Sequence, residues 1–279
     1  MILTNERYPS VAGGKLCVHR STPEGKLKAQ VLVLHGYAEH AQRYLPLIQA
    51  LYNYDIAVWA PDHTGHGKSD GVRGYIADYQ QAVDDAAHLV DLMRLDHPNL
   101  PLFIFGHSMG GGLAIHLAKR FQAHLKGLIL TGPTLEIASS PKWLQALAPI
   151  PGVLIPKVPF LPLPATDVSR DPEVSRRYRE DPLNYVGNIR FGMGWQVIRL
   201  TKKAMSYAPE LSLPIWLGHG EKDALTSIRG SKTFLSRVAS KEVSFRPVPD
   251  ARHEILNEPE GALLTEEIKN WILSKSSGK

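Results

Sequence analysis

The chain has 279 residues, of which 43% are hydrophobic and 21% are charged, and its formal net charge at pH 7 is +5. This length can bury one large α/β core, and the ordinary composition argues against a disordered or a membrane-spanning protein. The basic residues are spread along the chain with no basic block interleaved with aromatic residues, so we expect no nucleic-acid partner.

The N-terminal residues do not have the pattern of a secretory signal. Met1 to Arg7 lack a charged start followed by an apolar run. The single cysteine, Cys17, can form no internal disulfide, which suits a reducing compartment. We therefore expect a cytoplasmic protein.

Strands and helices alternate in the first part of the chain. Short apolar runs predict strands at 15–20, 29–34 and 56–60, and apolar residues at helical spacing predict helices at about 42–52 and 78–96. Such alternation with short connections is typical of a mostly parallel sheet with helices on both faces.

The loop after residue 60 suggests two ligand sites that we reject. Gly-Lys-Ser at 67–69 resembles the end of a phosphate-binding loop, but Asp62 stands where the first glycine belongs. A metal site at His63 and His66 is disfavoured because the stretch supplies no thiol and no helix to fix the ligands. We expect these residues to shape the loop, and we expect no metal and no cofactor.

A candidate nucleophile lies between the next strand and helix. An apolar run predicts a buried strand at 102–105, and helical spacing predicts a helix at 110–121. Between them, Gly-His-Ser-Met-Gly at 106–110 matches the pattern G-x-S-x-G. A strand that turns directly into a helix strains the backbone at the serine and exposes its hydroxyl. We therefore interpret Ser108 as a nucleophile rather than an incidental serine in a Gly-rich turn.

The regular pattern stops after the strand predicted at 125–131. Residues 135–208 combine many prolines with many large apolar side chains, so we expect neither a regular long helix nor a central strand there. We interpret this segment as a cap inserted into a core formed by 1–134 and 209–279. Its apolar side chains could be buried against the core or could face an acyl chain or a lipid surface.

The last part of the chain returns to alternating strands and helices, predicted at 215–217, 228–238, 243–248 and 260–274. Asp223 and His253 come shortly after the two strands of this part.

These residues complete a set that nucleophilic catalysis requires. A serine hydroxyl needs a base, and the base needs an acid that orients it. Ser108, Asp223 and His253 occur in this order, each after a predicted strand, and catalytic groups of open α/β sheets gather at the carboxyl ends of strands. Asp250 is the alternative to Asp223, because it is close to His253 in sequence.

The chain resembles the monoacylglycerol lipase and lysophospholipase branch of the α/β-hydrolases. The matching stretches are 35–40 with Arg43 and Tyr44, 62–71, 106–111, 220–223 and 252–254. The resemblance implies an α/β-hydrolase fold with a lid. It also implies that Ser108 attacks, that His253 accepts and returns the proton, and that Asp223 holds His253 in the working tautomer.

The resemblance further implies an oxyanion hole made by the backbone amides of Tyr37 and Met109. It places Glu39 and Arg43 near the polar end of the pocket, although a loop salt bridge and helix capping are the alternative roles for this pair. Tyr37 departs from the family, whose members often carry a small residue there.

We interpret the protein as a serine carboxylester hydrolase that converts monoacylglycerol to glycerol and fatty acid through an acyl-enzyme on Ser108. We predict that Leu144 and Ile150 of the cap contact the substrate, and that the cap touches a membrane surface. A lysophospholipase, a broad-specificity or hydroxycinnamoyl esterase and a serine aminopeptidase are alternatives on the same scaffold. A receptor that binds a small molecule without turnover is the alternative of another class, and the oligomeric state is left open.

Overall fold

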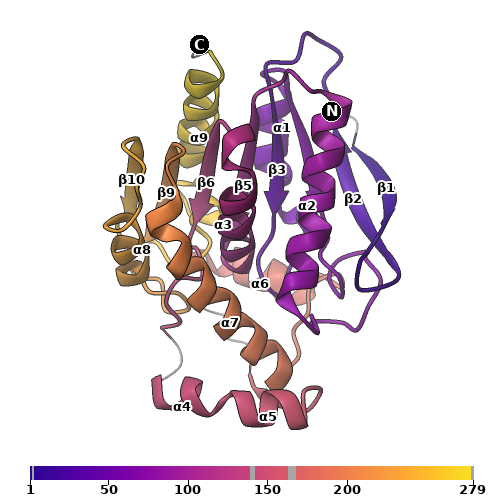
Figure 1. Cartoon of the computed structure of the whole chain (residues 1–279), viewed down its shortest axis with the longest axis vertical. Helices are drawn as coiled ribbons and strands as arrows, with labels where there is room; N and C mark the ends of the chain where they lie inside the picture. The colour runs from indigo at the N-terminus through magenta and orange to yellow at the C-terminus, as the bar shows by residue number, and fades with distance from the viewer. Residues whose placement is uncertain (2, 139–141, 163–167, 278–279) are drawn as a thin grey trace.

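The computed structural model describes residues 1, 3–138, 142–162 and 168–277. Its centre is an eight-stranded sheet in the order β1-β2-β4-β3-β5-β6-β9-β10 (Figure 1). The strands of this sheet are β1 Thr4–Pro9, β2 Lys15–Ser21, β3 Ala29–Leu34, β4 Ile56–Pro61, β5 Leu102–His107, β6 Gly127–Thr131, β9 Ile215–Gly220 and β10 Val243–Val248.

The sheet is mostly parallel, as predicted. Only the N-terminal strands β1 and β2 run antiparallel to their neighbours among these strands, and the others pair in parallel. Strands β3 and β5 are buried along their whole length, which explains their unbroken apolar sequences. Strand β1 is missing from the sequence prediction because its residues are largely exposed and polar.

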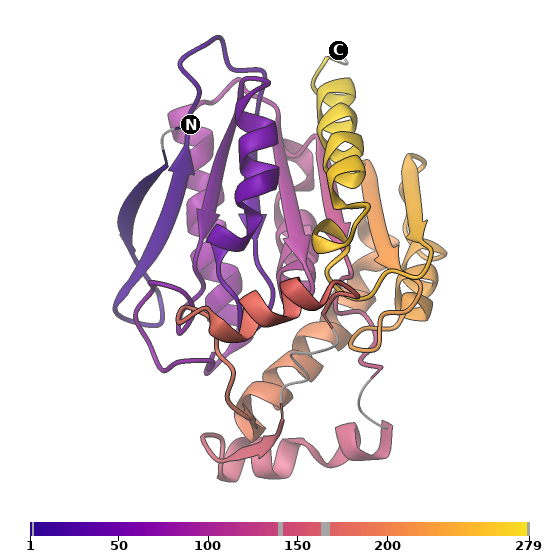
Figure 2. The same cartoon turned by 180° about the vertical axis from the view of Figure 1, so that it is seen from behind.

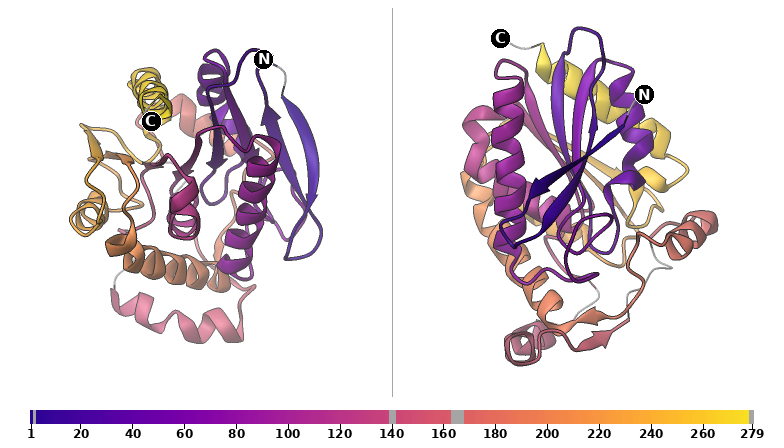
Figure 3. Two further views of the ribbon diagram at one scale, coloured as in Figure 1. Left: turned by 45° about the horizontal axis from the view of Figure 1, so that its top comes forward. Right: turned by 90° about the vertical axis from the view of Figure 1, so that its right-hand side faces the viewer.

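Helices cover both faces of the sheet. On one face lie α2 Tyr79–Asp96, α3 Met109–Phe121, α7 Phe191–Tyr207 and α8 Ile228–Leu235, and on the other lie α1 Leu45–Tyr52 and α9 Gly261–Ser276 (Figures 1 and 2). The right-hand view of Figure 3 shows the twisted sheet between these two layers. Short 3₁₀ helices occur at Ala41–Tyr44, Gln122–His124, Ala208–Glu210 and Ile255–Asn257.

Alternate side chains of each central strand enter different hydrophobic cores. In β3, Leu32 and Leu34 pack with the α2 and α3 side, whereas Val31 and Val33 pack with the α1 and α9 side. Burying a side chain of this size contributes roughly 1.5–3 kcal/mol. Because successive side chains point to opposite faces, each central strand packs against both helical layers.

The chain between β6 and β9 forms an additional layer. It contains α4 Lys142–Leu147, α5 Pro149–Leu154, β7 Pro159–Leu161, α6 Pro172–Glu180 and β8 Ile189–Arg190, followed by α7. Helix α6 lies across the carboxyl ends of the central strands, and α4 and α5 lie farther from the sheet (Figure 2). In the described part of the chain, no helix is both long enough and apolar enough to cross a bilayer.

The expectation that this segment has no regular long helix is wrong for α7, which has 17 residues. Helix α7 begins after the last proline of the segment, Pro182, so nothing interrupts its hydrogen bonds. Its Leu200 packs so closely on α3 that a Cβ placed on Gly112 would lie 2.9 Å from the Leu200 side chain. Helix α7 thus shares the main hydrophobic core.

We expect Gly110→Ala to destabilise the protein, because a Cβ on Gly110 would lie 2.2 Å from the carbonyl oxygen of Leu34. Overpacking against backbone costs about 1–3 kcal/mol or more. Gly194→Ala in α7 is the matched control: its Cβ would meet only ordinary contacts at 3.5 Å, and alanine favours a helix. Urea unfolding measures both changes, and equal stability of the two variants would contradict this packing.

Candidate active site

Ser108 occupies a strained turn between β5 and α3. Its backbone angles are φ 52° and ψ −118°, a region that costs a non-glycine residue about 1–3 kcal/mol. The Ser108 N–H donates to Thr131 O at 3.1 Å, and Ser108 O accepts from the N–H groups of Gly111 and Thr134 at 3.0 Å. The expected strained turn is therefore present, and hydrogen bonds from β6 and its following loop hold it.

Asp223 and His253 form a buried hydrogen-bonded pair. Asp223 lies in the turn after β9 and His253 in the loop after β10, and His253 Nδ1 lies 2.7 Å from Asp223 Oδ2. A carboxylate can only accept, so Nδ1 carries the hydrogen and Nε2 is the basic nitrogen of the neutral ring. Asp250, the alternative partner, is exposed.

The two groups of this pair shift each other's pKa. Burial alone would raise the pKa of Asp223, but His253 together with His219 outweighs burial and holds the pKa of this carboxyl well below its usual range. Burial alone would lower the pKa of His253, but the Asp223 carboxylate raises it above the usual 6.5. The pair therefore favours a charged carboxylate beside a readily protonated imidazole.

The structure brings the His253 ring to the residues that flank Ser108. The rings of His253 and His107 have centroids 4.7 Å apart. Gly132, at the end of β6, has a φ of 47°, and a Cβ there would lie 3.3 Å from His253 Nδ1. Among the hydrogen bonds of the described residues, none within 3.5 Å joins Ser108 Oγ to His253. The transfer of a proton between them belongs to the proposal below.

The loop after β3 lies directly against Ser108. A Cβ placed on Gly36 would lie 3.1 Å from Ser108 Cβ, so a larger residue there would require Ser108 to shift. Neither the N–H of Tyr37 nor that of Met109 donates a hydrogen bond to any acceptor in the described part of the chain. These amides are available to a ligand oxygen near Ser108.

Several contacts fix this loop. Glu39 Oε1 accepts from the N–H of Gly36 at 2.6 Å, and the Tyr37 hydroxyl donates to Gly74 O at 3.0 Å. The carbonyl of Ala38 accepts from the Tyr178 hydroxyl at 3.0 Å and from the Tyr185 N–H at 2.9 Å. Tyr178 lies on α6, so the segment between β6 and β9 helps to hold the loop.

Glu39 and Arg43 belong to a buried ion network. Arg43 donates to Glu39 at 2.9 Å and to both oxygens of Glu254 at 2.6 and 2.7 Å. Burial raises the pKa of Glu39, whereas Arg43 overcomes burial and lowers the pKa of Glu254 to about 2. These contacts fit the salt-bridge role that the sequence left open for Glu39 and Arg43, and their position near a substrate headgroup stays a prediction.

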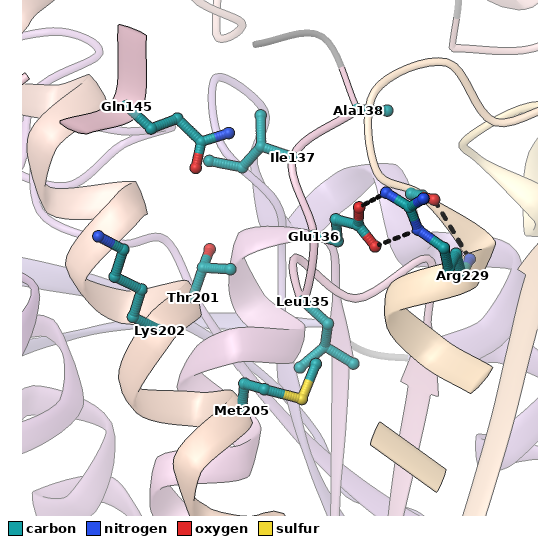
Figure 4. A pocket seen from close by; sticks show the side chains of 10 residues that line it. Leu135, Glu136, Ile137, Ala138, Gln145, Thr201, Lys202, Met205 and Arg229 are labelled. Atoms are coloured by element: carbon teal, nitrogen blue, oxygen red, sulfur yellow. Dashed lines mark hydrogen bonds and ion pairs between the residues drawn. The ribbon is translucent and has the colours of Figure 1, made fainter. Parts of the chain in front are cut away.

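A cavity of about 790 Å³ lies next to the segment that follows β6 (Figure 4). Its wall begins at Leu135, next to Thr134, whose N–H binds Ser108 O. Leu135, Ile137 and Met205 give it apolar surface, and Lys202 and the ion-paired Arg229 give it charge. The residues that line it are Leu135, Glu136, Ile137, Ala138, Gln145, Thr201, Lys202, Met205, Ser227 and Arg229.

The predicted substrate contacts of the cap are not among these lining residues. Ile150 is 62% exposed on α5. The side chain of Leu144, on α4, lies outside the described residues. Gln145, which the sequence prediction did not single out, supplies the contact of α4 with the cavity. No signal in the sequence distinguishes it, because polar residues on short helices are common.

One group of side chains in the described residues has ligand types that suit a metal. Cys17, His19 and Asp62 are buried, and their ligand atoms lie within 4.8 Å of one another. His19 Nε2 lies 3.2 Å from Asp62 Oδ2, and the Asp62 carboxylate also accepts from the N–H groups of Ala41 and Lys68. These bonds already engage the carboxylate, so we assign the group to fixing the loop that follows β4.

Comparison with known proteins decides the family. The family model described as serine aminopeptidase, S33, matches residues 25–260. The chain belongs to this family. It is 36% identical over 269 residues to the monoacylglycerol lipase of Mycolicibacterium smegmatis, covering 96% of each chain. It is 31% identical to the monoglyceride lipase of Homo sapiens, covering 91% of this chain and 86% of that one.

A solved structure of the family agrees. The crystal structure of Paleococcus ferrophilus monoacylglycerol lipase matches with a TM-score of 0.81 and 28% identity, covering 99% of this chain and 100% of that one. This match and the family model confirm the predicted α/β-hydrolase fold and the resemblance drawn from the sequence. The S33 family member described here is thus a serine hydrolase.

We expect Asp223→Asn to lower the pKa of His253 below 6.5 in this S33 protein. The amide carries no charge, so the opposing effect of burial on His253 then dominates. An NMR titration of the His253 ring measures the change. Asp250→Asn, at an exposed position, is the control and should leave the titration where it is. A wild-type titration in Asp223→Asn would reject the pairing.

Proposed function

We propose that this serine hydrolase cleaves the ester bond of monoacylglycerols. The observation that carries the proposal is the buried Asp223–His253 pair beside the strained Ser108 turn, in a chain that is 36% identical to a monoacylglycerol lipase. Two relatives of the chain are named monoacylglycerol or monoglyceride lipase, and the triad chemistry suits an ester.

The reaction uses Ser108 as the nucleophile. His253 Nε2 accepts the hydroxyl proton while Ser108 Oγ bonds to the ester carbonyl carbon, and Asp223 stabilises the imidazolium that forms. His253 then gives the proton to the leaving glycerol oxygen. Water, deprotonated by the same nitrogen, attacks the acyl-enzyme, and the fatty acid leaves as Ser108 regains its proton.

The backbone amides of Tyr37 and Met109 would stabilise the negative oxygen of the tetrahedral intermediate. Tyr37 lies in the loop after β3 and Met109 is the first residue of α3, so the fold holds both amides in place before substrate binds, which is what electrostatic stabilisation requires. Loss of one such donor typically costs 10²–10³-fold in rate. A contact within the loop supports this role: Gly36 O, in the same peptide as the Tyr37 N–H, lies 2.7 Å from His35 Nδ1, and hydrogen bonds to Gly36 N–H and Ala38 O hold the chain on either side.

The cavity between Leu135 and Met205 is our candidate for the acyl chain. Its wall continues from the segment that contacts Ser108, and its volume of about 790 Å³ falls in the range of small-molecule sites. The segment 135–208 then acts as the cap over a core of 1–134 and 209–279. Glycerol would lie on the side of Glu39 and Arg43, and contacts from Leu144 and Ile150 remain part of the proposal.

We expect Ser108→Ala to reduce monoacylglycerol hydrolysis by about 10⁴-fold or more, because no other group can form the acyl-enzyme. Rates on monoacylglycerol, lysophospholipid, a short nitrophenyl ester, a hydroxycinnamate ester and an aminopeptidase substrate measure the loss and rank the substrates. Ser236→Ala, at an exposed serine, is the control. Full turnover by Ser108→Ala would reject the mechanism. If the wild-type enzyme cleaved lysophospholipid faster than monoacylglycerol, lysophospholipid would be the preferred substrate instead.

We also propose that α4, α5 and the chain after them contact a lipid surface. Large apolar side chains are exposed there in close succession, which is unusual for a protein surrounded by water. They are Trp143, Leu147, Ile150, Val153, Leu154, Ile155 and Val158. Such a surface can enter the headgroup region of a membrane, where a monoacylglycerol substrate resides.

We expect the double change Trp143→Ser and Leu147→Ser to reduce flotation of the protein with phosphatidylcholine vesicles. Each side chain is more than half exposed, and its transfer into lipid would be lost. Leu95→Ser is the control, because Leu95 is 78% exposed at the end of α2, outside the cap. Hydrolysis of a soluble short ester should stay the same, and unchanged flotation would contradict this contact.

A further inference from the structure

A second histidine lies against the Asp223 carboxylate. His219 is in β9 and is completely buried. Its Nε2 lies 3.2 Å from Asp223 Oδ2, the oxygen that also binds His253. The triad alone does not require a histidine at this position, and the sequence pattern did not single it out.

The neighbours of His219 determine where its hydrogen lies. On the Nε2 side, Thr226 O lies at 3.2 Å and the Asp223 carboxylate at 3.2 Å, and both can only accept. Nε2 must therefore carry a hydrogen. On the other side, Nδ1 lies 2.8 Å from Ser231 Oγ, a hydroxyl that can donate to it. The hydrogen bond of Nε2 is to Thr226 O, and the polar Nε2–H group also lies close enough to the Asp223 carboxylate to stabilise its charge electrostatically.

Hydrogen-bond donors also converge on this carboxylate. The Thr226 hydroxyl lies 2.8 Å from Asp223 Oδ2, and the N–H groups of Leu225 and Thr226 donate to Oδ1 at 2.8 and 3.0 Å. Every donor that shares the negative charge leaves less of it to attract the proton of His253. The balance between His219, Thr226 and His253 therefore sets how strongly His253 holds a proton.

We propose that His219 is a positioning residue of this hydrolase, which acts through Asp223 to limit the proton affinity of His253 and to fix the turn 223–226. The inference rests on the proposed triad. It assigns to His219 a role in the rate and its pH dependence, in addition to filling space in the core.

The direction of the effect follows from the groups around His253. These groups are Asp223 in the turn after β9, His107 at the end of β5, Glu254 next to His253 in the sequence, and Glu39 in the loop after β3. Arg43 neutralises the charge of Glu254. Removal of the His219 N–H leaves more of the Asp223 charge to His253, so the pKa of His253 rises. Because the base must be neutral, the acidic limb of kcat/KM moves to higher pH.

The experiment compares His219→Leu with His219→Gln in the full-length enzyme. Leucine removes the donor, whereas the glutamine side-chain amide can still present an N–H. We expect His219→Leu to move the acidic limb of kcat/KM for a soluble nitrophenyl ester up by roughly half to one pH unit, with KM little changed. His219→Gln should restore at least half of this shift, and Ser236→Ala should cause none.

Thr226→Val tests the same balance with little change of shape. It removes the hydroxyl that lies against Asp223 Oδ2, so the limb should move in the same direction as in His219→Leu. This variant decides the question if His219→Leu does not fold. A folded His219→Leu or Thr226→Val with the wild-type limb overturns the inference, and so does a His219→Gln shift as large as that of His219→Leu.

Failure of this inference is distinct from failure of the proposed function. If Ser108→Ala keeps full activity, the triad is wrong and the pH limb has another origin. If Ser108→Ala is inactive while the His219 and Thr226 variants keep the wild-type limb, the triad stands and His219 only fills the core.

Discussion

The register of the parallel strands is the constraint on which the site depends. Leu34 of β3 pairs with Gly106 of β5, His107 of β5 pairs with Thr131 of β6, and Thr131 pairs with Gly218 of β9. The carboxyl ends of these strands therefore lie side by side, and the residues that follow them meet. The Gly36 loop, Ser108, Gly132 and Asp223 come together although they are far apart in sequence.

This meeting point places charged groups where little water reaches them, so each charge needs a partner. Arg43 is bound by Glu39 and Glu254, and Asp223 is bound by His253 and lies against His219. Breaking such a buried pair by removing one partner typically costs about 3–5 kcal/mol, because the other charge remains in the interior. The charges stabilise the site only as complete sets.

The sequence was sufficient for the central sheet apart from its edge strand β1, and for the order of the candidate triad. Unbroken apolar runs mark β3 and β5 because both faces of these strands are covered, and a serine directly after β5 can only stand in a turn. Strand β1 gave no such signal, since an exposed edge strand buries few apolar residues. Helix α7 was obscured by the prolines that precede it.

The partners of the site were harder to predict, because pairing across long separations leaves no local pattern. Tyr178 and Ala38 are 140 residues apart, and Arg43 and Glu254 are 211 apart. His219 precedes the quoted motif at 220–223 by one residue, yet its contact with Asp223 depends on how the turn after β9 folds back. Such contacts require the three-dimensional structure.

The hydrogen bonds from Tyr178 and Tyr185 to the Ala38 carbonyl have a consequence for protein engineering. The insertion that lines most of the cavity also holds the carbonyl of Ala38, one residue after Tyr37. A lid transplanted from another hydrolase would therefore change turnover as well as substrate choice, unless it brought donors for this carbonyl. In the proposed mechanism, selectivity and speed are thus coupled through one backbone oxygen.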